Sequence, residues 1–421
     1  MTATLNHTDE RTTTDREAAQ ETKNVFFVSL DEFNHNQLRL MRNANRFSFH
    51  PLLEYEEIPR EVGEVADIDD LLDEARRRLD AFPGSIDGIS TFWDFPAAEM
   101  APILCHERGL SGPTLQAVLR SQHKYWARLE QKAAVPECVP GFCPVNVYDD
   151  ASLAAIDLAY PFWIKPVRAY SSHLGFRIRN RDDLKNAVEE IREKIPRLGD
   201  PFNAILRHAG ELPPEVEGVD GRWCVAERII SGRQCTLEGW VHNGETHVFG
   251  AIDSRRMPNG SSFSRYQYPS TLPNQVQQRM IDITRRLMEH IGYDDAAFNI
   301  ELFWQRDTNR IHLLEVNTPG LAVTHRPLHQ GQRQPEPPGQ RGSSPWAKGP
   351  PCRIATEVSS DARASSSSAA TRTEWSPDRR PRPSSRSCRT GSPPRRSSSR
   401  RPRARASPRW STRTATPTSS R

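Results

Sequence analysis

The sequence lacks the features that mark membrane-spanning, secreted and disulfide-rich proteins. No stretch approaches the roughly 18 consecutive apolar residues of a membrane-spanning helix, and residues 1–23 contain no apolar segment typical of a signal peptide. The seven cysteines are odd in number, and the closest pair, Cys138 and Cys143, lacks the two-residue spacing of zinc and redox sites. We therefore expect reduced cysteines and a cytoplasmic location.

Lysine, acidic and aliphatic residues are scarce in the last part of the chain. Residues 327–421 hold 20 Lys and Arg, of which only Lys348 is a lysine, against 5 Asp and Glu. This segment thus carries a charge of +15, which leaves −11 for residues 1–326 because the whole chain carries +4. Its Arg, Ser and Pro composition offers too little apolar area to offset the entropy of ordering. We expect residues 327–421 to be disordered, as we do residues 1–23.

Between these two segments, strand and helix patterns alternate, which is typical of an α/β protein. "NVFFVSL" (24–30) and "SIDGISTF" (85–92) predict buried strands, and "DIDDLLDEARRRLDAF" (67–82) predicts an amphipathic helix between them. We expect these elements to form a small βαβ domain. Further along, Asn243-Gly244 between two apolar runs is a strong hairpin signal.

A second predicted hairpin contains candidate metal ligands. "FNIELFW" (298–304) and "RIHLLEVN" (310–317) flank a polar turn, and a turn centred near Thr308 places Glu301 opposite Glu315, with Asn317 on the same face. Two carboxylates so close repel each other. Mg²⁺ or Mn²⁺ with oxygen ligands would remove the repulsion. A solvated face with exposed acids is the alternative, and the apolar flanks favour the metal site.

Phosphate-binding motifs of the glycine-rich loop classes are absent, but "WIKPVRAYSSHLGFRI" (163–178) offers another arrangement. Lys165 ends an apolar strand, and Ser171 and Ser172 lie in the polar loop that follows. A lysine at a strand end reaches phosphate oxygens, and serine hydroxyls cradle them. Taken alone, the motif fits a surface lysine beside an ordinary turn better than a phosphate site.

In their order along the chain, these motifs resemble the ATP-grasp superfamily, in particular its carboxylate-amine ligases and biotin-carboxylase-like members. The resemblance runs from about Asn24 to Asn317. "QHKYWARLE" is similar to the helix with the first ATP lysine, "FWIKP" to the strand with the second, and "CVAERIISGRQCTLEGWV" to the hinge that meets the adenine. The resemblance implies an ATP site formed by Lys124, Lys165, Ser171, Ser172, Glu227, Arg228, Ile230 and Gln234. It also implies a metal site of Glu301, Glu315 and Asn317 and, at the end of "VFGAIDSRR", a candidate catalytic arginine, Arg255.

The resemblance further implies an α/β ATP-grasp fold with a preceding αβ domain at 24–115. Linker helices and a lid subdomain follow at 116–222, and a C-terminal antiparallel-sheet subdomain with the metal site at 223–326. The implied activity is that of an ATP- and Mg²⁺-dependent ligase that activates a small-molecule carboxylate as an acyl phosphate for attack by an amine. We leave a homodimer open. The basic tail also fits a nucleic-acid arm, which we rank below the ligase.

One departure from the family pattern follows Thr318. After Glu-x-Asn-Thr many relatives have an arginine, and here Pro319 takes its place. The degenerate codons for residues 319–325 are compatible with a frame one base later that encodes Arg-Val-Ser-Gln-Ser-His, the kind of continuation that the family has. We hypothesise that the chain leaves its ancestral reading frame after Thr318, and sequencing the coding DNA tests this. If so, a non-catalytic ATP-binding protein that has lost C-terminal active-site elements is the alternative to a ligase.

Overall fold

The computed structural model describes residues 22–58, 67–169, 173–256 and 263–318. The chain divides into two units, Met1–Arg363 and Ala364–Arg421, and every described residue lies in the first. The predicted disordered segments, 1–23 almost entirely and 327–421 entirely, lie outside the described residues, as do Ser171 and Ser172. No helix in the described part of the chain is long and apolar enough to cross a membrane.

The first sheet is parallel and three-stranded, with the order β2-β1-β3. It consists of β1 (Lys23–Leu30), β2 (Phe47–Glu54) and β3 (Gly88–Thr91). Helix α2 (Ile68–Ala81) begins at the N-cap Asp67 and buries Ile68, Leu72, Ala75 and Leu79, which lie on one face at helical spacing. The remaining elements of this region are α1 (Glu32–Arg39), η1 (Ala44–Arg46), η2 (Tyr55–Glu57) and α3 (Ala97–Glu107). Two strands and a helix are thus found where the sequence predicts them.

The second sheet is antiparallel, with the order β4-β7-β5-β6. Its strands are β4 (Phe142–Val145), β5 (Phe162–Pro166), β6 (Phe176–Ile178) and β7 (Cys224–Arg228). Helix α7 (Arg181–Lys194) buries apolar residues in the same cluster as those of β5. Three short helices complete the region: α6 (Asp150–Ala154), α8 (Pro196–Arg207) and α9 (Pro214–Glu217). The predicted boundary between residues 222 and 223 falls before β7, whereas hydrogen bonding places β7 in this sheet beside β5.

The third sheet is antiparallel and five-stranded, with the order β10-β9-β8-β11-β12. Its strands are β8 (Arg233–His242), β9 (Glu245–Arg256), β10 (Phe263–Gln267), β11 (Ala296–Gln305) and β12 (Arg310–Asn317). The predicted β8–β9 hairpin is confirmed, and both of its turn residues, Asn243 and Gly244, have positive φ. Helix α10 (Asn274–Ile291) packs against β8, β9 and β11 and buries Met280 and Leu287 in the core of this sheet.

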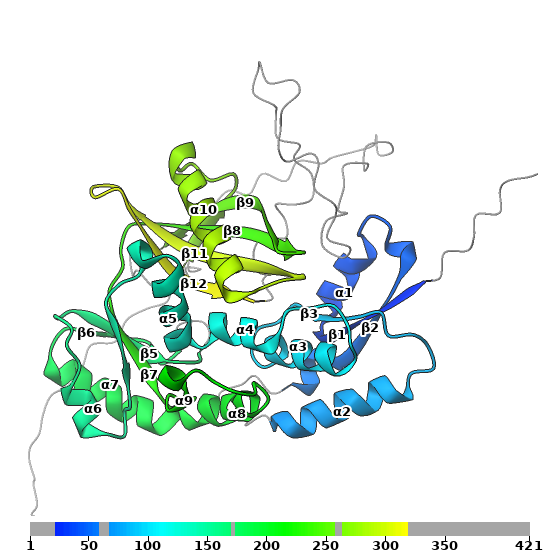
Figure 1. Cartoon of the computed structure of the whole chain (residues 1–421), viewed down its shortest axis with the longest axis horizontal. Helices are drawn as coiled ribbons and strands as arrows, with labels where there is room; N and C mark the ends of the chain where they lie inside the picture. The colour runs from blue at the N-terminus through cyan, green and yellow to red at the C-terminus, as the bar shows by residue number, and fades with distance from the viewer. Residues whose placement is uncertain (1–21, 59–66, 170–172, 257–262, 319–421) are drawn as a thin grey trace, which may run out of the picture. The chain divides into compact units, whose positions relative to one another are not determined.

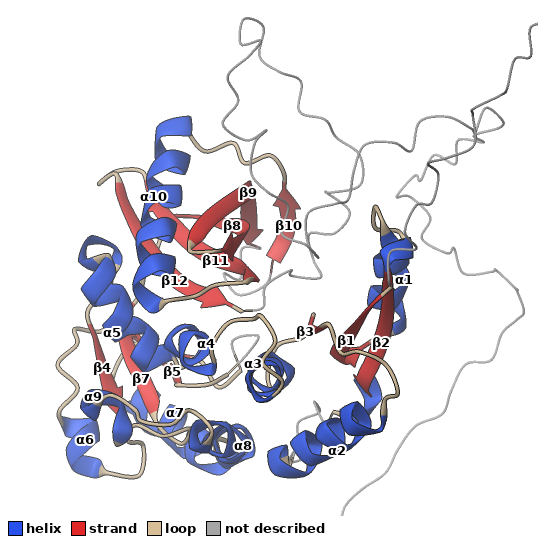
Figure 2. Ribbon diagram, turned by 45° about the vertical axis from the view of Figure 1, so that its right-hand side comes forward, coloured by secondary structure: helices blue, strands red, loops and turns tan. Residues whose placement is uncertain are grey.

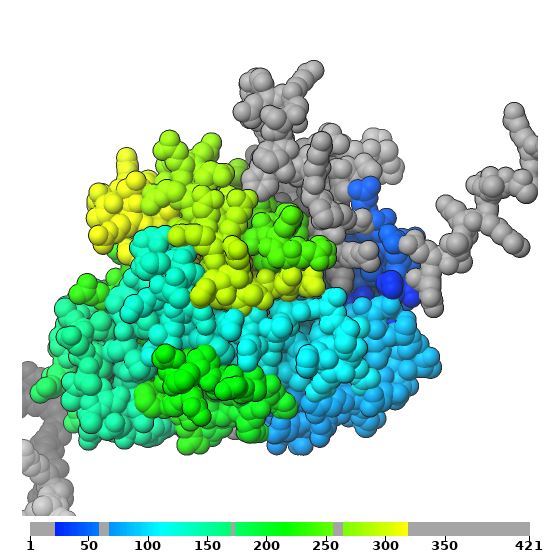
Figure 3. Space-filling model, viewed as in Figure 1, coloured from blue at the N-terminus to red at the C-terminus, as the bar shows by residue number. Residues whose placement is uncertain are grey.

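Helices α4 (Leu115–Gln122) and α5 (Lys124–Ala134) connect the three sheets, and η3 (Pro136–Cys138) follows them. α4 contacts α3 and β12, whereas α5 contacts α10, β4 and β7. The two helices lie between the antiparallel sheets in Figures 1 and 2. In the space-filling view, the yellow residues of the β11–β12 region meet the cyan residues of this helical segment (Figure 3). The α/β class predicted from the sequence is confirmed.

Candidate functional site

The β11–β12 hairpin brings the predicted metal ligands onto neighbouring strands. Glu301 pairs with Glu315, as the sequence predicts, and Asn317 lies two residues further along β12. The predicted register is wrong nearer the turn, where Gln305 pairs with Arg310. An irregularity between Glu301 and Leu302 shifts the register by one residue, as a β-bulge does, and restores the predicted pairing at the glutamates.

Two amide side chains hold the polar residues of this hairpin. Asn317 donates through Nδ2 to Oδ1 of Asn299, at 3.3 Å, and Gln234 of β8 donates through Nε2 to Oε2 of Glu301, at 2.5 Å. Gln234, predicted as part of the ATP site, therefore contacts a predicted metal ligand here. Our sequence analysis missed Asn299, although the register that pairs Glu301 with Glu315 also places Asn299 opposite Asn317.

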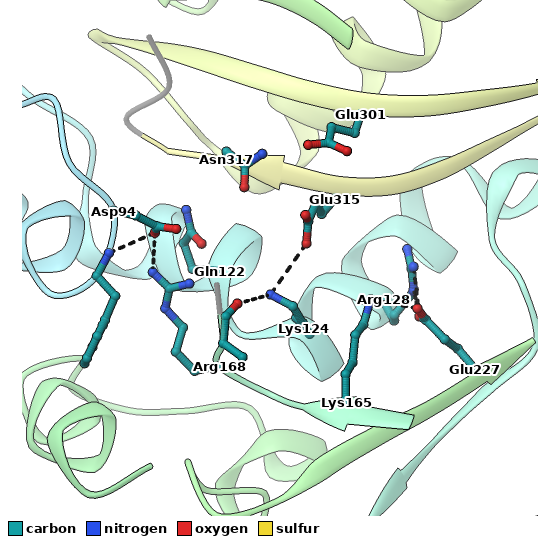
Figure 4. A network of polar contacts seen from close by, with 12 residues as sticks. Asp94, Gln122, Lys124, Arg128, Lys165, Arg168, Glu227, Glu301, Glu315 and Asn317 are labelled. Carbon is teal, nitrogen blue, oxygen red and sulfur yellow. Dashed lines mark hydrogen bonds and ion pairs between the residues drawn. The ribbon is translucent and has the colours of Figure 1, made fainter. Parts of the chain in front are cut away.

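Lys124 joins the helical segment to the hairpin (Figure 4). It is the first residue of α5, which the side chain of His123 caps by accepting from Trp126 N. Its ammonium lies 3.5 Å from Oε2 of Glu315 and donates to the carbonyl oxygen of Ala169, at 2.9 Å. Burial lowers the pKa of Lys124, and Glu315 opposes this effect. A predicted phosphate-binding cation and a predicted metal-binding carboxylate therefore lie in one site.

Lys165 and Glu227 form the second charged group of the site. They lie on neighbouring strands, β5 and β7, and their charged atoms are 2.7 Å apart. Arg128 binds the other carboxylate oxygen of Glu227, at 2.9 Å, and donates to the carbonyl oxygen of Leu313 on β12. Burial alone would raise the pKa of Glu227, but Arg128 and Lys165 together lower it to about 2. Each oxygen of the Glu227 carboxylate thus binds a cationic side chain.

Arg128 is a functional candidate that our sequence analysis missed. It lies one helical turn after Lys124 on α5, and residues at this spacing share a helix face. That spacing is the signal that could have identified it. Its side chain is buried, so its charge is stabilised almost entirely by Glu227 and by oxygen acceptors on Gln131 and Leu313.

Three other predicted residues, Arg228, Ile230 and Arg255, lie outside this network. Arg228, at the end of β7, is exposed, its backbone N–H donates to Gly141, and Ile230 follows in the segment that leads to β8. Arg255 is exposed on β9, beside Arg265 of β10, and makes no ion pair with a described residue. The network of Figure 4 therefore collects Lys124, Lys165, Glu227, Glu301, Glu315 and Asn317.

Residues 158–325 match the model of the ATP-grasp domain. Among solved structures, the chain is similar to an L-amino acid ligase from Bacillus licheniformis, with a TM-score of 0.52, 18% identity and coverage of 73% of this chain and 70% of that one. It is also similar to a biotin carboxylase from Campylobacter jejuni, with a TM-score of 0.52, 15% identity and coverage of 73% and 67%. A D-Ala:D-Ser ligase from Enterococcus faecalis gives a TM-score of 0.51, 13% identity and coverage of 71% and 91%.

The search of curated proteins gives no match. These structures share the fold with our chain, and the matched domain contains Lys165, the segment between β7 and β8 that we predict to meet the adenine, and the whole β11–β12 hairpin. We conclude that residues 158–325 match the ATP-grasp domain and that the chain is similar in fold to these ligases.

Proposed function

We propose that this protein is an ATP- and Mg²⁺-dependent ligase that joins a small-molecule carboxylate to an amine. One observation carries the proposal: the Lys124 ammonium lies 3.5 Å from the Glu315 carboxylate. A cation suited to phosphate oxygens thus meets a carboxylate suited to a divalent metal ion. Lys165, the second lysine of the network, lies on the strand before the predicted phosphate-covering loop.

The donor set fits a hard divalent cation. Glu301 and Glu315 supply carboxylate oxygens from paired strands, and Asn317 donates through Nδ2 to Asn299, which leaves its Oδ1 available as a third oxygen ligand. No group of three or more His, Cys, Asp or Glu that suits a metal occurs among the described residues, so the amide is an essential part of the proposed set. When bound, Mg²⁺ would neutralise phosphate charge during transfer.

The residues of this chain have distinct proposed roles in the reaction. Lys124 and Lys165 neutralise and position the phosphates of ATP, and Glu227 holds Lys165 in place. The backbone at Arg228 and Ile230 receives the adenine, and Gln234 the ribose; Ser171 and Ser172 would cover the phosphates, and Arg255 would bind phosphate or substrate.

In the proposed reaction, a carboxylate oxygen of the substrate bonds to the terminal phosphorus as ADP leaves. The amine then bonds to the acyl carbon as phosphate leaves, and the amine nitrogen loses a proton. The protein supplies positions and charges for both steps.

The second candidate is a protein that binds ATP without ligase activity. The Glu-x-Asn-Thr motif is held in place to its last residue, because Gln122 donates to both the carbonyl and the hydroxyl oxygen of Thr318, at 2.9 and 3.1 Å. Pro319 follows where relatives have an arginine. Residues that bind nucleotide thus precede the proposed change of frame, whereas later catalytic elements would be lost.

The test measures Mg·ATP binding and ADP formation with the full chain. Loss of one charge-assisted contact to phosphate weakens binding by about 10- to 100-fold, which we expect for Lys165→Met and Glu315→Gln. The matched control is Lys132→Met, an exposed lysine on α5. Equal affinity for Lys165→Met and the control contradicts the assigned site. ADP formation stimulated by mixtures of acids and amines supports a ligase, and binding without such turnover supports the second candidate.

A further inference from the structure

A buried cluster of three charges lies next to the proposed site. Asp94 follows β3, Glu99 lies in the first turn of α3, and Arg168 follows β5, so the cluster joins the first and second sheets. The Arg168 guanidinium donates through Nη2 to Asp94, at 2.6 Å, and through Nε to Glu99, at 2.9 Å. Arg168 and Glu99 are 2% and 0% exposed, whereas the Asp94 side chain is 45% exposed.

The cluster has one more carboxylate than cations. Oε2 of Glu99 is buried and has no hydrogen-bond partner among the residues that the structure describes. Asp94 uses Oδ1 for both Arg168 and the backbone N–H of Phe95, and within the same residues its Oδ2 accepts no hydrogen bond. A buried carboxylate without a compensating charge is costly. The cluster of Asp94, Glu99 and Arg168 therefore has a net charge of −1 when both carboxylates are ionised. A further cation can bind to the exposed side of Asp94.

The exposed side of Asp94 belongs to the same polar network as the proposed active site. Figure 4 shows Asp94 beside Arg168, with Gln122, Lys124 and Asn317 as its neighbours in the network. Asp94 acts electrostatically on both Lys124 and Glu315. Lys124 is already engaged by Glu315 and by the carbonyl of Ala169. The missing positive charge can be a proton on Glu99, or it can come from a bound molecule that reaches the exposed side of Asp94.

We propose that the carboxylate substrate is an amino acid and that Asp94 binds its ammonium group. This inference rests on the proposed function and narrows its substrate class. A substrate with only a carboxylate would be repelled by the excess negative charge of Asp94 and Glu99. An amino acid places its ammonium on Asp94 and leaves its carboxylate for the cationic side of the site at Lys124.

Binding of the ammonium group also changes the protonation of the cluster. Burial raises the pKa of Glu99 to about 7, Arg168 opposes this rise, and Asp94 adds to it. An ammonium group on Asp94 takes over part of the negative charge that Glu99 experiences, so the pKa of Glu99 falls. A fraction of a proton is then released for each amino acid bound near pH 7, and a cluster with a purely structural role would not release it.

The first test compares two mixtures added to the full chain with Mg²⁺ and a non-hydrolysable ATP analogue. One mixture holds the standard amino acids other than lysine and arginine, and the other holds their N-acetyl derivatives, which keep the carboxylate but lose the ammonium charge. We expect the free amino acids to raise the unfolding temperature by a few degrees and the N-acetyl mixture to leave it unchanged. Equal shifts, or no shift with the free amino acids while the nucleotide analogue still binds, overturn the inference.

Variants separate the roles of the two carboxylates. Asp94→Asn leaves Arg168 balanced by Glu99 and should abolish the shift. Glu107→Gln, which removes an exposed carboxylate on the same helix that also pairs with an arginine, is the matched control and should retain it. A retained shift in Asp94→Asn refutes the assignment.

The second test follows protons by calorimetry in two buffers of different ionisation enthalpy, with the amino acid that gives the largest shift. Proton release at pH 7 should vanish in Glu99→Gln while binding persists. Release that is unchanged in this variant refutes the coupling.

Failure of the proposed function gives a different result, because the nucleotide analogue alone then leaves the unfolding temperature unchanged. In that case the two mixtures are compared without nucleotide, and the same outcomes decide whether Asp94 recognises an ammonium group.

Discussion

Glu227 of β7 allows a quantitative test of the charge network beside the second sheet. Its carboxylate is buried and is held by Arg128 and Lys165, which lower its pKa from an ordinary 4.5 to about 2. This change in pKa corresponds to ~3 kcal/mol of folding free energy, because each pKa unit is worth about 1.4 kcal/mol. Glu227→Gln keeps the shape of the side chain and removes the charge. We therefore expect the variant to lose ~3 kcal/mol of stability at pH 7.

The pH dependence follows from the direction of the pKa change. A carboxyl group whose pKa is lower in the folded state stabilises the protein fully above its unfolded pKa, and this contribution is lost as the pH falls through the folded pKa. The window for Glu227 thus runs from about pH 4.5 down to about pH 2. We expect the deficit of Glu227→Gln to be complete at pH 7 and pH 5 and to shrink to ~2 kcal/mol at pH 3.5.

The assay is urea unfolding followed by tryptophan fluorescence at pH 7, 5 and 3.5. Glu107→Gln is the matched control, because it breaks an exposed pair with Arg76 that should contribute no more than about 1 kcal/mol. If Glu227→Gln unfolds at the same urea concentration as this control at pH 7, the network does not stabilise the protein. A deficit that stays constant down to pH 3.5 also contradicts the reasoning, because it would not depend on the ionisation of Glu227.

Two further predictions concern packing and the buried cluster. Gly239→Ala should cost more than about 2 kcal/mol in a urea unfolding series, because the added Cβ collides with the carbonyl oxygen of His247 and the ring of Phe298. Gly244→Ala, at a positive-φ turn position with open space around it, should cost only about 1 kcal/mol in the same series, and equal losses would refute the steric argument. Arg168→Met should cost ~3 to 5 kcal/mol at pH 7, because two carboxylates lose their common cation. This loss should be smaller at pH 5, where Glu99 takes up a proton, and a loss that grows toward pH 5 would contradict it.

Local sequence patterns predicted the two hairpins, because the conformation of a hairpin depends mainly on the residues of its turn and strands. The period-two alternation and the polar turn of the last hairpin predicted that Glu301 lies opposite Glu315, and this pairing is found because the register irregularity beside Glu301 offsets the one-residue error nearer the turn. Asn243 and Gly244 adopt positive φ readily, so the preceding hairpin was equally clear. β2 was not predicted, because a strand that contains Pro51 and carries partly buried residues shows no clean alternation. The predicted domain boundary after residue 222 did not anticipate the sheet to which β7 belongs, because that depends on pairing with β4 and β5.

The sequence by itself determined the presence of the last hairpin and the α/β class, because these depend on patterns among residues close together in the chain. Only the tertiary structure showed which charges meet: Arg128 and Glu227 are 99 positions apart, and Arg168 and Glu99 are 69 positions apart. The register irregularity beside Glu301 was likewise hidden, because it follows from packing among three strands. Charge pairing across sheets depends on distance in space, and no local pattern encodes that distance.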